Sequence, residues 1–120
     1  MPPIEPGRKA PDFTLLDQDD AAFTLSEQAC PIVLFFYPKD CTSGCTLEAQ
    51  DFARLVPRFR KAGAEVVGVS ILNTRSKRKF IEQAGLKGIR LLADDRLNTD
   101  GKPDPEMAQR YGVWAEKYMY

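Results

Sequence analysis

Residues 32–50 read IVLFFYPKDCTSGCTLEAQ, and the predicted fold is built outward from this segment. It opens with an apolar and aromatic run that ends at Pro38, a pattern typical of a strand buried on both faces of a mostly parallel sheet. A short polar loop then leads to Cys45. Beyond it, apolar residues recur at the three- and four-residue steps of a helix: Leu47, Phe52, Leu55, Val56 and Phe59. The pattern predicts a strand that delivers a thiol to the first turn of a helix, where unpaired backbone N–H groups and the helix dipole favour a thiolate.

The overall composition indicates one small globular domain. The chain has 120 residues, of which 43% are hydrophobic, enough for a single core, so we expect one domain over residues 1–120. Seventeen basic and seventeen acidic side chains cancel, which argues against nucleic-acid and membrane-surface partners. No apolar run approaches the roughly 18 residues of a membrane span, and residues 1–13 lack the apolar region of a signal peptide. We therefore expect a soluble, cytoplasmic protein.

Cysteine and histidine usage narrows the chemistry further. The three cysteines are Cys30, Cys41 and Cys45, an odd number that suits redox chemistry better than a structural disulfide framework. The chain has no histidine, which excludes Ser-His-Asp and Cys-His catalysis, a histidine general base and histidine-ligated metals. An activated cysteine must therefore rely on backbone donors, hydroxyl groups and Lys or Arg.

The remaining patterns predict strands alternating with helices, which is typical of an α/β domain. Strands are expected over 12–16, 23–25, 32–37, 65–72 and 89–93, the first two as a hairpin, and helices over 43–62, 76–84 and 106–110. Thr42 or Ser43 is a candidate cap of the first helix, in which Pro57 predicts a kink or a break. Ser76 is expected to cap the second helix, and Ser26 a brief helical turn.

The segment YPKDCTSGCTLEAQDF at residues 37–52 resembles the active-site segment of peroxiredoxins, in particular the Q-type group, also called bacterioferritin comigratory proteins. Further segments resemble the family in the right order along nearly the whole chain: APDFTLLDQD, KAGAEVVGVS, KFIEQAGL, LLADD and YGVW. The resemblance implies a thioredoxin-like fold with a central mixed sheet flanked by helices. It also implies a thiol-dependent peroxidase that reduces hydrogen peroxide and organic hydroperoxides, is recycled by thioredoxin or a similar dithiol, and needs no cofactor.

The same resemblance implies roles for four residues. Cys45 would be the peroxidatic cysteine, whose thiolate attacks a peroxide O–O bond and becomes a sulfenic acid. Thr42 would hold the thiolate and the peroxide oxygens through its hydroxyl, and Pro38 would shield the site from water. The backbone N–H groups of Gly44 and Cys45 would donate to the peroxide, as a displacement at oxygen requires.

The chain departs from the family pattern at the second cysteine. Gln50 occupies the position, five residues after Cys45, where Q-type relatives carry a resolving cysteine, and the helix expected over 76–84 has no cysteine either. Cys41 is then the first candidate to resolve the sulfenic acid, because it is nearest in sequence, and Cys30 is a second. The alternative is a one-cysteine enzyme that is reduced by an outside thiol.

A further departure concerns the end of the chain. Family members continue past YGVW into a strand with a catalytic arginine, another strand and a helix, whereas six residues follow Trp114 here. None of five arginines sits in the matching motif: Arg54, Arg58, Arg60, Arg90 and Arg110. The family's next strand would lie beside residues 32–37, so its absence would expose an apolar edge. We expect either a homodimer or strand-swapped oligomer that covers this edge, or a truncated product with impaired activity.

Two other classes compete with the active enzyme. One is a catalytically impaired scaffold, because the arginine site is missing. The other is a thioredoxin-like Cu(I)-binding protein, because Cys41 and Cys45 form a C-x-x-x-C pair after the predicted buried strand and two thiolates can bind Cu(I). Proteins of that kind also use a distant histidine ligand, which this chain lacks.

Overall fold

The computed structural model describes residues 4–37, 40–41, 43–86, 88–97, 99–102, 104 and 106–113, except for the side chain of Cys45. Within these ranges the elements follow one another as β1 (Thr14–Asp17), β2 (Ala22–Thr24), the 3-10 helix η1 (Leu25–Glu27), β3 (Ile32–Phe36), α1 (Ser43–Lys61), β4 (Glu65–Ser70), α2 (Thr74–Ala84), β5 (Arg90–Ala93) and α3 (Glu106–Arg110). No helix in these ranges is long and apolar enough to cross a membrane.

The strands form one mixed sheet in the order β2-β1-β5-β4-β3. Strands β3, β4 and β5 run parallel, whereas β1 is antiparallel to both β2 and β5. Parallel neighbours need crossovers, and α1 and α2 supply them. The mixed sheet flanked by helices confirms the predicted α/β fold. Among the described strands β3 stands at an edge of the sheet, as the sequence predicted.

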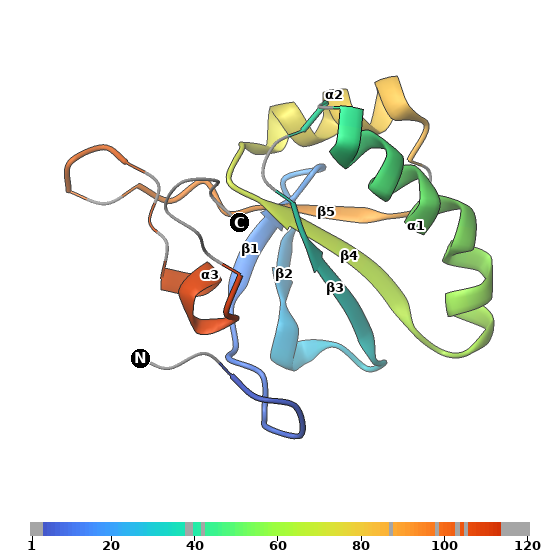
Figure 1. The fold of residues 1–120 in the computed structure, drawn as a ribbon, viewed down its shortest axis with the longest axis horizontal. Helices are drawn as coiled ribbons and strands as arrows, with labels where there is room; N and C mark the ends of the chain where they lie inside the picture. Colours follow the sequence, from blue (N-terminus) through green and yellow to red (C-terminus); the bar gives the residue numbers. More distant parts are fainter. Residues whose placement is uncertain are drawn as a thin grey trace.

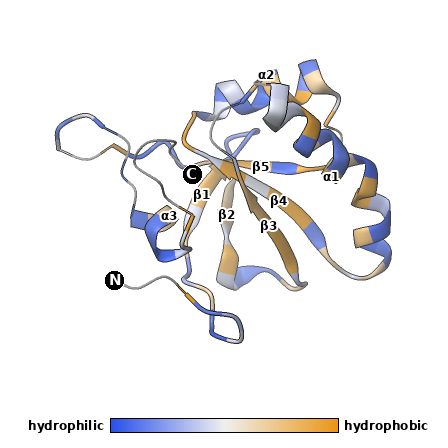
Figure 2. Ribbon diagram, viewed as in Figure 1, coloured by the Kyte–Doolittle hydropathy of each residue, from blue (hydrophilic) through white to orange (hydrophobic). Residues whose placement is uncertain are grey.

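Helices cover the two faces of the sheet unequally. Figure 1 shows α1 and α2 together on one side of the sheet and α3 apart from them, near β1. The core under α1 and α2 contains Ala49, Val56 and Phe80 from the helices and Phe35, Tyr37, Val66 and Leu91 from the sheet region. The other core contains Leu15, Phe23, Val67, Val69 and Leu92, with Met107 from α3. Alternation along β4 therefore places successive side chains in different cores, and much of the strand has the hydrophobic colour in Figure 2, interrupted by paler and bluer segments.

Gly68 makes room for the ring of Phe35 on the neighbouring strand. A Cβ atom at this position would lie 2.7 Å from the Phe35 ring and 2.9 Å from Leu91. Phe35 lies across this gap and stacks on Phe52 of α1, with the ring centroids 4.4 Å apart. The absence of a side chain at Gly68 therefore allows α1 to pack closely on β3.

The structure corrects several element predictions. Strand β4 ends at Ser70, two residues before the predicted end, and β3 is only half-buried for most of its length because it lies at the sheet edge. Helix α1 continues through Pro57, which is exposed, so the predicted break does not occur, whereas the alternative of a kink stays a prediction. The predicted hairpin is confirmed as β1 and β2, with a turn in which Asp17 Oδ1 accepts the backbone N–H of Asp19.

Two predicted caps are also wrong. Asn73, not Ser76, caps α2: its side chain accepts the backbone N–H of Ser76, 2.9 Å away. Ser26 lies inside η1 and not before it, and its backbone and hydroxyl both donate to the carboxylate of Asp12. The predicted end of α2 is confirmed, because Gly85 adopts the left-handed conformation with φ 67°.

Candidate active-site loop

The loop between β3 and α1 carries most of the predicted site. Pro38 and Thr42 lie outside the described residues, so their predicted roles stay predictions. The described part of the loop comprises Tyr37, Asp40 and Cys41. Tyr37 continues the pairing of β3, since its backbone N–H donates to Val69 O at 3.1 Å.

Cys45 is the third residue of α1, a helix of 19 residues. Its backbone lies in the first turn, where N–H groups have no carbonyl acceptor within the helix and where the helix dipole favours negative charge. Gly44 is exposed, and among the described residues no atom outside its chain neighbours and its own helix backbone lies within 4 Å of the position that a Cβ would take. The backbone of Cys45 therefore lies where the sequence predicted, after the strand and its loop and at the start of the helix.

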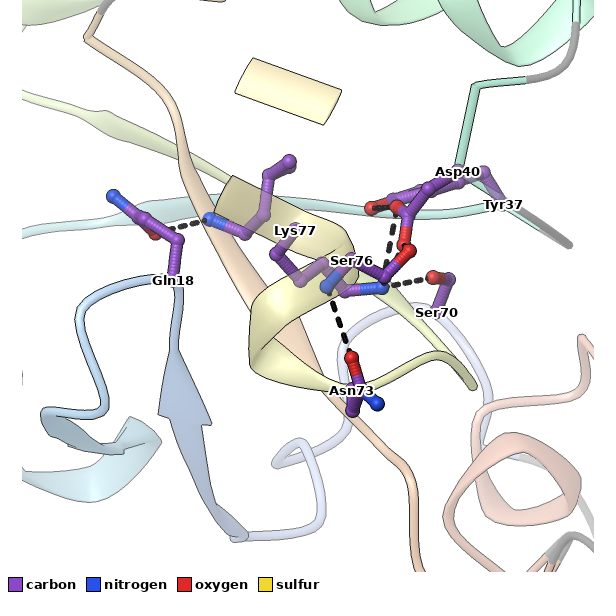
Figure 3. A network of polar contacts seen from close by, with 8 residues as sticks. Gln18, Tyr37, Asp40, Ser70, Asn73, Ser76 and Lys77 are labelled. Atoms are coloured by element: carbon purple, nitrogen blue, oxygen red, sulfur yellow. Dashed lines mark hydrogen bonds and ion pairs between the residues drawn. The ribbon is translucent and has the colours of Figure 1, made fainter. Parts of the chain in front are cut away.

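A buried polar network holds the loop at Asp40, as Figure 3 shows. The Asp40 carboxylate accepts hydrogen bonds from the Tyr37 hydroxyl at 2.5 Å and the Ser76 hydroxyl at 2.7 Å. Lys77 Nζ pairs with it at 3.0 Å and also bonds the Ser70 hydroxyl, at the end of β4. The side chains of Asp40 and Lys77 are both 0% exposed. The network therefore joins the loop to the first turn of α2 and to the central sheet.

Burial dominates the electrostatics of Lys77. Desolvation lowers the pKa of its ammonium, and the attraction of Asp40 only partly opposes this effect. The ammonium also lies 5.2 Å from the centre of the Tyr37 ring, whose face attracts cations. Sequence reasoning missed this pair. The sequence did contain one indication of it: Lys77 lies three residues before Phe80 and four before Ile81, which places it on the apolar face of α2.

Cys41 lies on the exposed side of the same loop. Its backbone is in the left-handed region with φ 63°, which is uncommon for a residue with a side chain. Its Sγ lies 3.4 Å from Oε1 of Gln83 on α2, and it is a free thiol. Gln50, at the expected position of a resolving cysteine, donates to Ala84 O at 3.0 Å and so also contacts the end of α2.

Cys30 lies at the other end of β3 from the active-site loop. It is half-buried in an apolar groove of about 290 Å³ lined by Ala10, Leu25, Cys30, Ile32, Leu34 and Tyr111. Strand β3 has five residues, which span about 17 Å at 3.3 Å per residue. Cys30 is therefore too far from the loop to reach Cys45 within one folded chain, whereas Cys41 belongs to the loop itself.

The described arginines mostly contact groups away from the loop. Arg60 donates to Gly88 O, Arg90 pairs with Asp17, and Arg110 lies 4.0 Å from Glu106. Arg54 pairs with Asp51 on the surface of α1. Within the described ranges there is no group of three or more His, Cys, Asp or Glu side chains that could hold a metal ion.

Comparisons with known proteins agree with this arrangement. Residues 6–120 match the model of the AhpC/TSA family. A Helicobacter pylori protein named as a peroxiredoxin of the bcp type is 41% identical over 121 residues, covering 100% of this chain and 74% of that protein. The peroxiredoxin Bcp of Escherichia coli K12 is 33% identical and covers 98% of this chain and 70% of the relative.

Solved structures show the same likeness. The peroxidoxin BcpB of Mycobacterium tuberculosis superposes with a TM-score of 0.76 at 34% identity, covering 88% of this chain and 64% of that one. Peroxiredoxin Q of Xanthomonas campestris gives 0.75 at 35% identity, covering 90% and 63%. The chain thus spans about three quarters of the first curated relative and just under two thirds of these structures. These matches favour the prediction of a peroxiredoxin with a thioredoxin-like fold and do not favour the Cu(I)-binding alternative.

Proposed function

Since the chain belongs to the AhpC/TSA family, in its bcp and peroxiredoxin Q group, we propose that it is a thiol-dependent peroxidase for hydrogen peroxide and organic hydroperoxides. The observation that carries this proposal is the position of Cys45 in the first turn of α1, directly after the loop that follows β3. The helix end favours the thiolate, which is the reactive form of the side chain. Asp40 anchors the loop a few residues before it.

In the proposed reaction, the Cys45 thiolate attacks one oxygen of the peroxide. A sulfur–oxygen bond forms and the O–O bond breaks, and the second oxygen leaves as water or an alcohol after taking up a proton. Cys45 is oxidised by two electrons to a sulfenic acid, and the peroxide is reduced by two. Thr42 and the backbone N–H groups of Gly44 and Cys45 stabilise the charge that develops on the oxygens, and Pro38 limits access of water.

The sulfenic acid then has two routes back to the thiol. In the first, Cys41 condenses with it to a disulfide, which thioredoxin or a similar dithiol reduces. The position of Cys41 in the same loop supports this route over one through Cys30, which lies beyond the far end of β3. In the second, an outside thiol reduces the sulfenic acid directly. Mass spectrometry after one equivalent of peroxide distinguishes them by a Cys41–Cys45 disulfide or a lasting sulfenic acid.

Peroxide consumption with dithiothreitol or thioredoxin tests the main proposal. We expect activity in the unmodified protein and in Cys30→Ser, and none above background in Cys45→Ser. Cys30→Ser is the matched control because it makes the same change at a half-buried cysteine remote from the loop. Equal activity of Cys45→Ser and the unmodified protein would contradict the proposal, and no activity in either would indicate the catalytically impaired scaffold.

We also propose that a second copy of the chain covers the edge of β3. The strand carries the sequence IVLFF, it pairs with β4 alone among the described strands, and such an edge is a template for pairing. Sedimentation velocity over a wide concentration range tests this assembly. A dimer that dissociates on dilution is the expected result, and a monomer at every concentration would contradict it. The cytoplasmic location and the single domain over residues 1–120 stay predictions.

A further inference from the structure

The buried pair between Asp40 and Lys77 spans two parts of the chain that are 37 residues apart. Asp40 belongs to the loop before Cys45, and Lys77 belongs to the first turns of α2. Every donor that contacts the Asp40 carboxylate in the described structure comes from a group that is itself packed: Tyr37 and Lys77 are fully buried and Ser76 is half-buried. The loop can therefore leave α2 only if these charged hydrogen bonds break.

The next residue, Cys41, takes its position from this anchor. Its left-handed backbone directs the thiol onto Gln83 of α2, 3.4 Å away. The sulfur is a single bond beyond Cβ, so rotation of the side chain moves it within a small circle only. A larger displacement of the thiol requires the backbone at residues 40–41 to move, and that backbone is held by the Asp40 carboxylate.

We propose that Lys77 is a positioning residue of the peroxidatic loop, which through Asp40 holds Cys41 against α2 and so limits the rate at which Cys41 reaches oxidised Cys45. This inference rests on the proposed function. The step that it controls is the condensation of the Cys41 thiol with the Cys45 sulfenic acid. A sulfur–sulfur bond forms, the sulfenic S–O bond breaks, and the sulfenic oxygen leaves as water with the thiol proton. While the latch formed by Asp40 and Lys77 stays closed, the sulfenic acid persists and remains open to an outside thiol.

Two variants break the ion pair between Asp40 and Lys77 in different ways. Lys77→Met removes the cation and leaves the Asp40 carboxylate buried without its ion-pair partner. The double variant Asp40→Asn, Lys77→Met removes both charges together, which avoids an unpaired buried charge and keeps the experiment usable where the single variant does not fold. Circular dichroism establishes that each variant is folded before its chemistry is compared.

The measurement is the rate of Cys41–Cys45 disulfide formation, followed by acid quench and mass spectrometry of non-reduced peptides. One arm uses one equivalent of hydrogen peroxide. The second uses diamide, which oxidises two thiols to a disulfide and therefore needs no peroxidase activity. We expect the double variant to form the disulfide at least ten-fold faster than the unmodified protein in both arms.

Two controls separate positioning from a general loss of stability. Lys79→Met makes the same change at an exposed position of α2, and Asn73→Ala weakens the helix cap without touching the pair. Both should form the disulfide at the unmodified rate. An unchanged rate in the folded double variant, an equal acceleration in Asn73→Ala, or no Cys41–Cys45 disulfide in any variant would overturn the proposal. If disulfide formation is accelerated with diamide but no disulfide forms with hydrogen peroxide, the positioning role of Lys77 is supported and the proposed peroxidase activity is contradicted.

Discussion

Two aspartates flank Cys45, and each forms an ion pair of nearly the same length. Before Cys45, Asp40 pairs with Lys77 at 3.0 Å, and both side chains are 0% exposed. After it, Asp51 pairs with Arg54 at 3.1 Å, and these side chains are 67% and 73% exposed. The N···O distances of the two pairs are nearly equal although one cation is an ammonium and the other a guanidinium, so the largest difference between the pairs is their burial.

The difference indicates how the site is held. Water and salt screen the pair on α1, and such pairs contribute little to stability. In the buried pair each charge has lost its water, so the loss of one partner leaves the other uncompensated. The loop before Cys45 is therefore anchored in the core, whereas the first turns of α1 lie at the surface, where Leu47 is 65% exposed.

The largest effect is expected from breaking the buried pair on one side. Lys77→Met should lower the free energy of unfolding by about 3–5 kcal/mol, because the Asp40 carboxylate stays buried without its counter-ion. Urea unfolding followed by circular dichroism measures this change. Lys79→Met, on the same helix but exposed, is the control and should stay within about 0.5 kcal/mol of the unmodified protein.

The pH dependence sharpens the same prediction. Because the pKa of folded Lys77 is lowered, the unfolded chain binds more protons at this site between that pKa and 10.5. The contribution of Lys77 to the free energy of unfolding therefore rises with pH across this window and falls as pH drops through the lowered pKa. The difference in stability between the unmodified protein and the Asp40→Asn, Lys77→Met variant should show this rise. A pH-independent difference would contradict the lowered pKa.

A smaller effect is expected when the pair stays but loses one hydrogen bond. Tyr37→Phe removes the hydroxyl that donates to Asp40 at 2.5 Å and keeps the ring beneath Lys77. A hydrogen bond to a charged group contributes about 1.5–3 kcal/mol, so the free energy of unfolding should fall by that amount. Chemical denaturation measures it, and a loss below about 0.5 kcal/mol would show that water replaces the hydroxyl.

Local patterns predicted the elements that depend on nearby residues. The strand at 32–37, the helix that begins near Ser43, the strand near 89–93 and the helix at 106–110 all occur within a residue or two of their predicted bounds. Each has a continuous apolar run, a helical apolar period or a glycine close to one end. The cap of α2 was missed because Asn73 and Ser76 are both good capping residues. Only the folded backbone shows that the side chain of Asn73 accepts the N–H of Ser76.

The anchor of the site could not be predicted in the same way. The sequence indicated Cys45 through the strand and helix around it, but Asp40 looked like an ordinary polar loop residue. Its burial depends on Lys77, which is far away in the chain and reaches it only after α2 packs on the sheet. That Cys30 is too far away to resolve Cys45 within one chain could have been predicted from the sequence, since the length of β3 separates Cys30 from the loop.

The helix that supplies Lys77 gives a more moderate test. Asn73→Ala removes the side-chain acceptor for the Ser76 N–H but leaves the ion pair in place. Loss of an N-cap lowers stability by about 1 kcal/mol. Urea unfolding should show this decrease. Relative to the unmodified protein, hydrogen exchange in the variant should be accelerated in the first turn of α2 more than in β4. Asn73→Asp, which keeps the acceptor, should restore stability, and a failure to do so would place the effect elsewhere.

The smallest effect should come from the exposed pair. Asp51→Ala removes the partner of Arg54 on the surface of α1, where both groups remain hydrated. Exposed pairs three residues apart on a helix contribute about 0.2–0.5 kcal/mol and are screened by salt. The change in the free energy of unfolding should therefore stay below about 0.5 kcal/mol and diminish further in 1 M NaCl, whereas the effect of Lys77→Met should persist at that salt concentration because no ions reach the buried pair. Equal salt sensitivity of the two variants would mean that solvent reaches Asp40, and the contrast between the two sides of Cys45 would then not be one of burial.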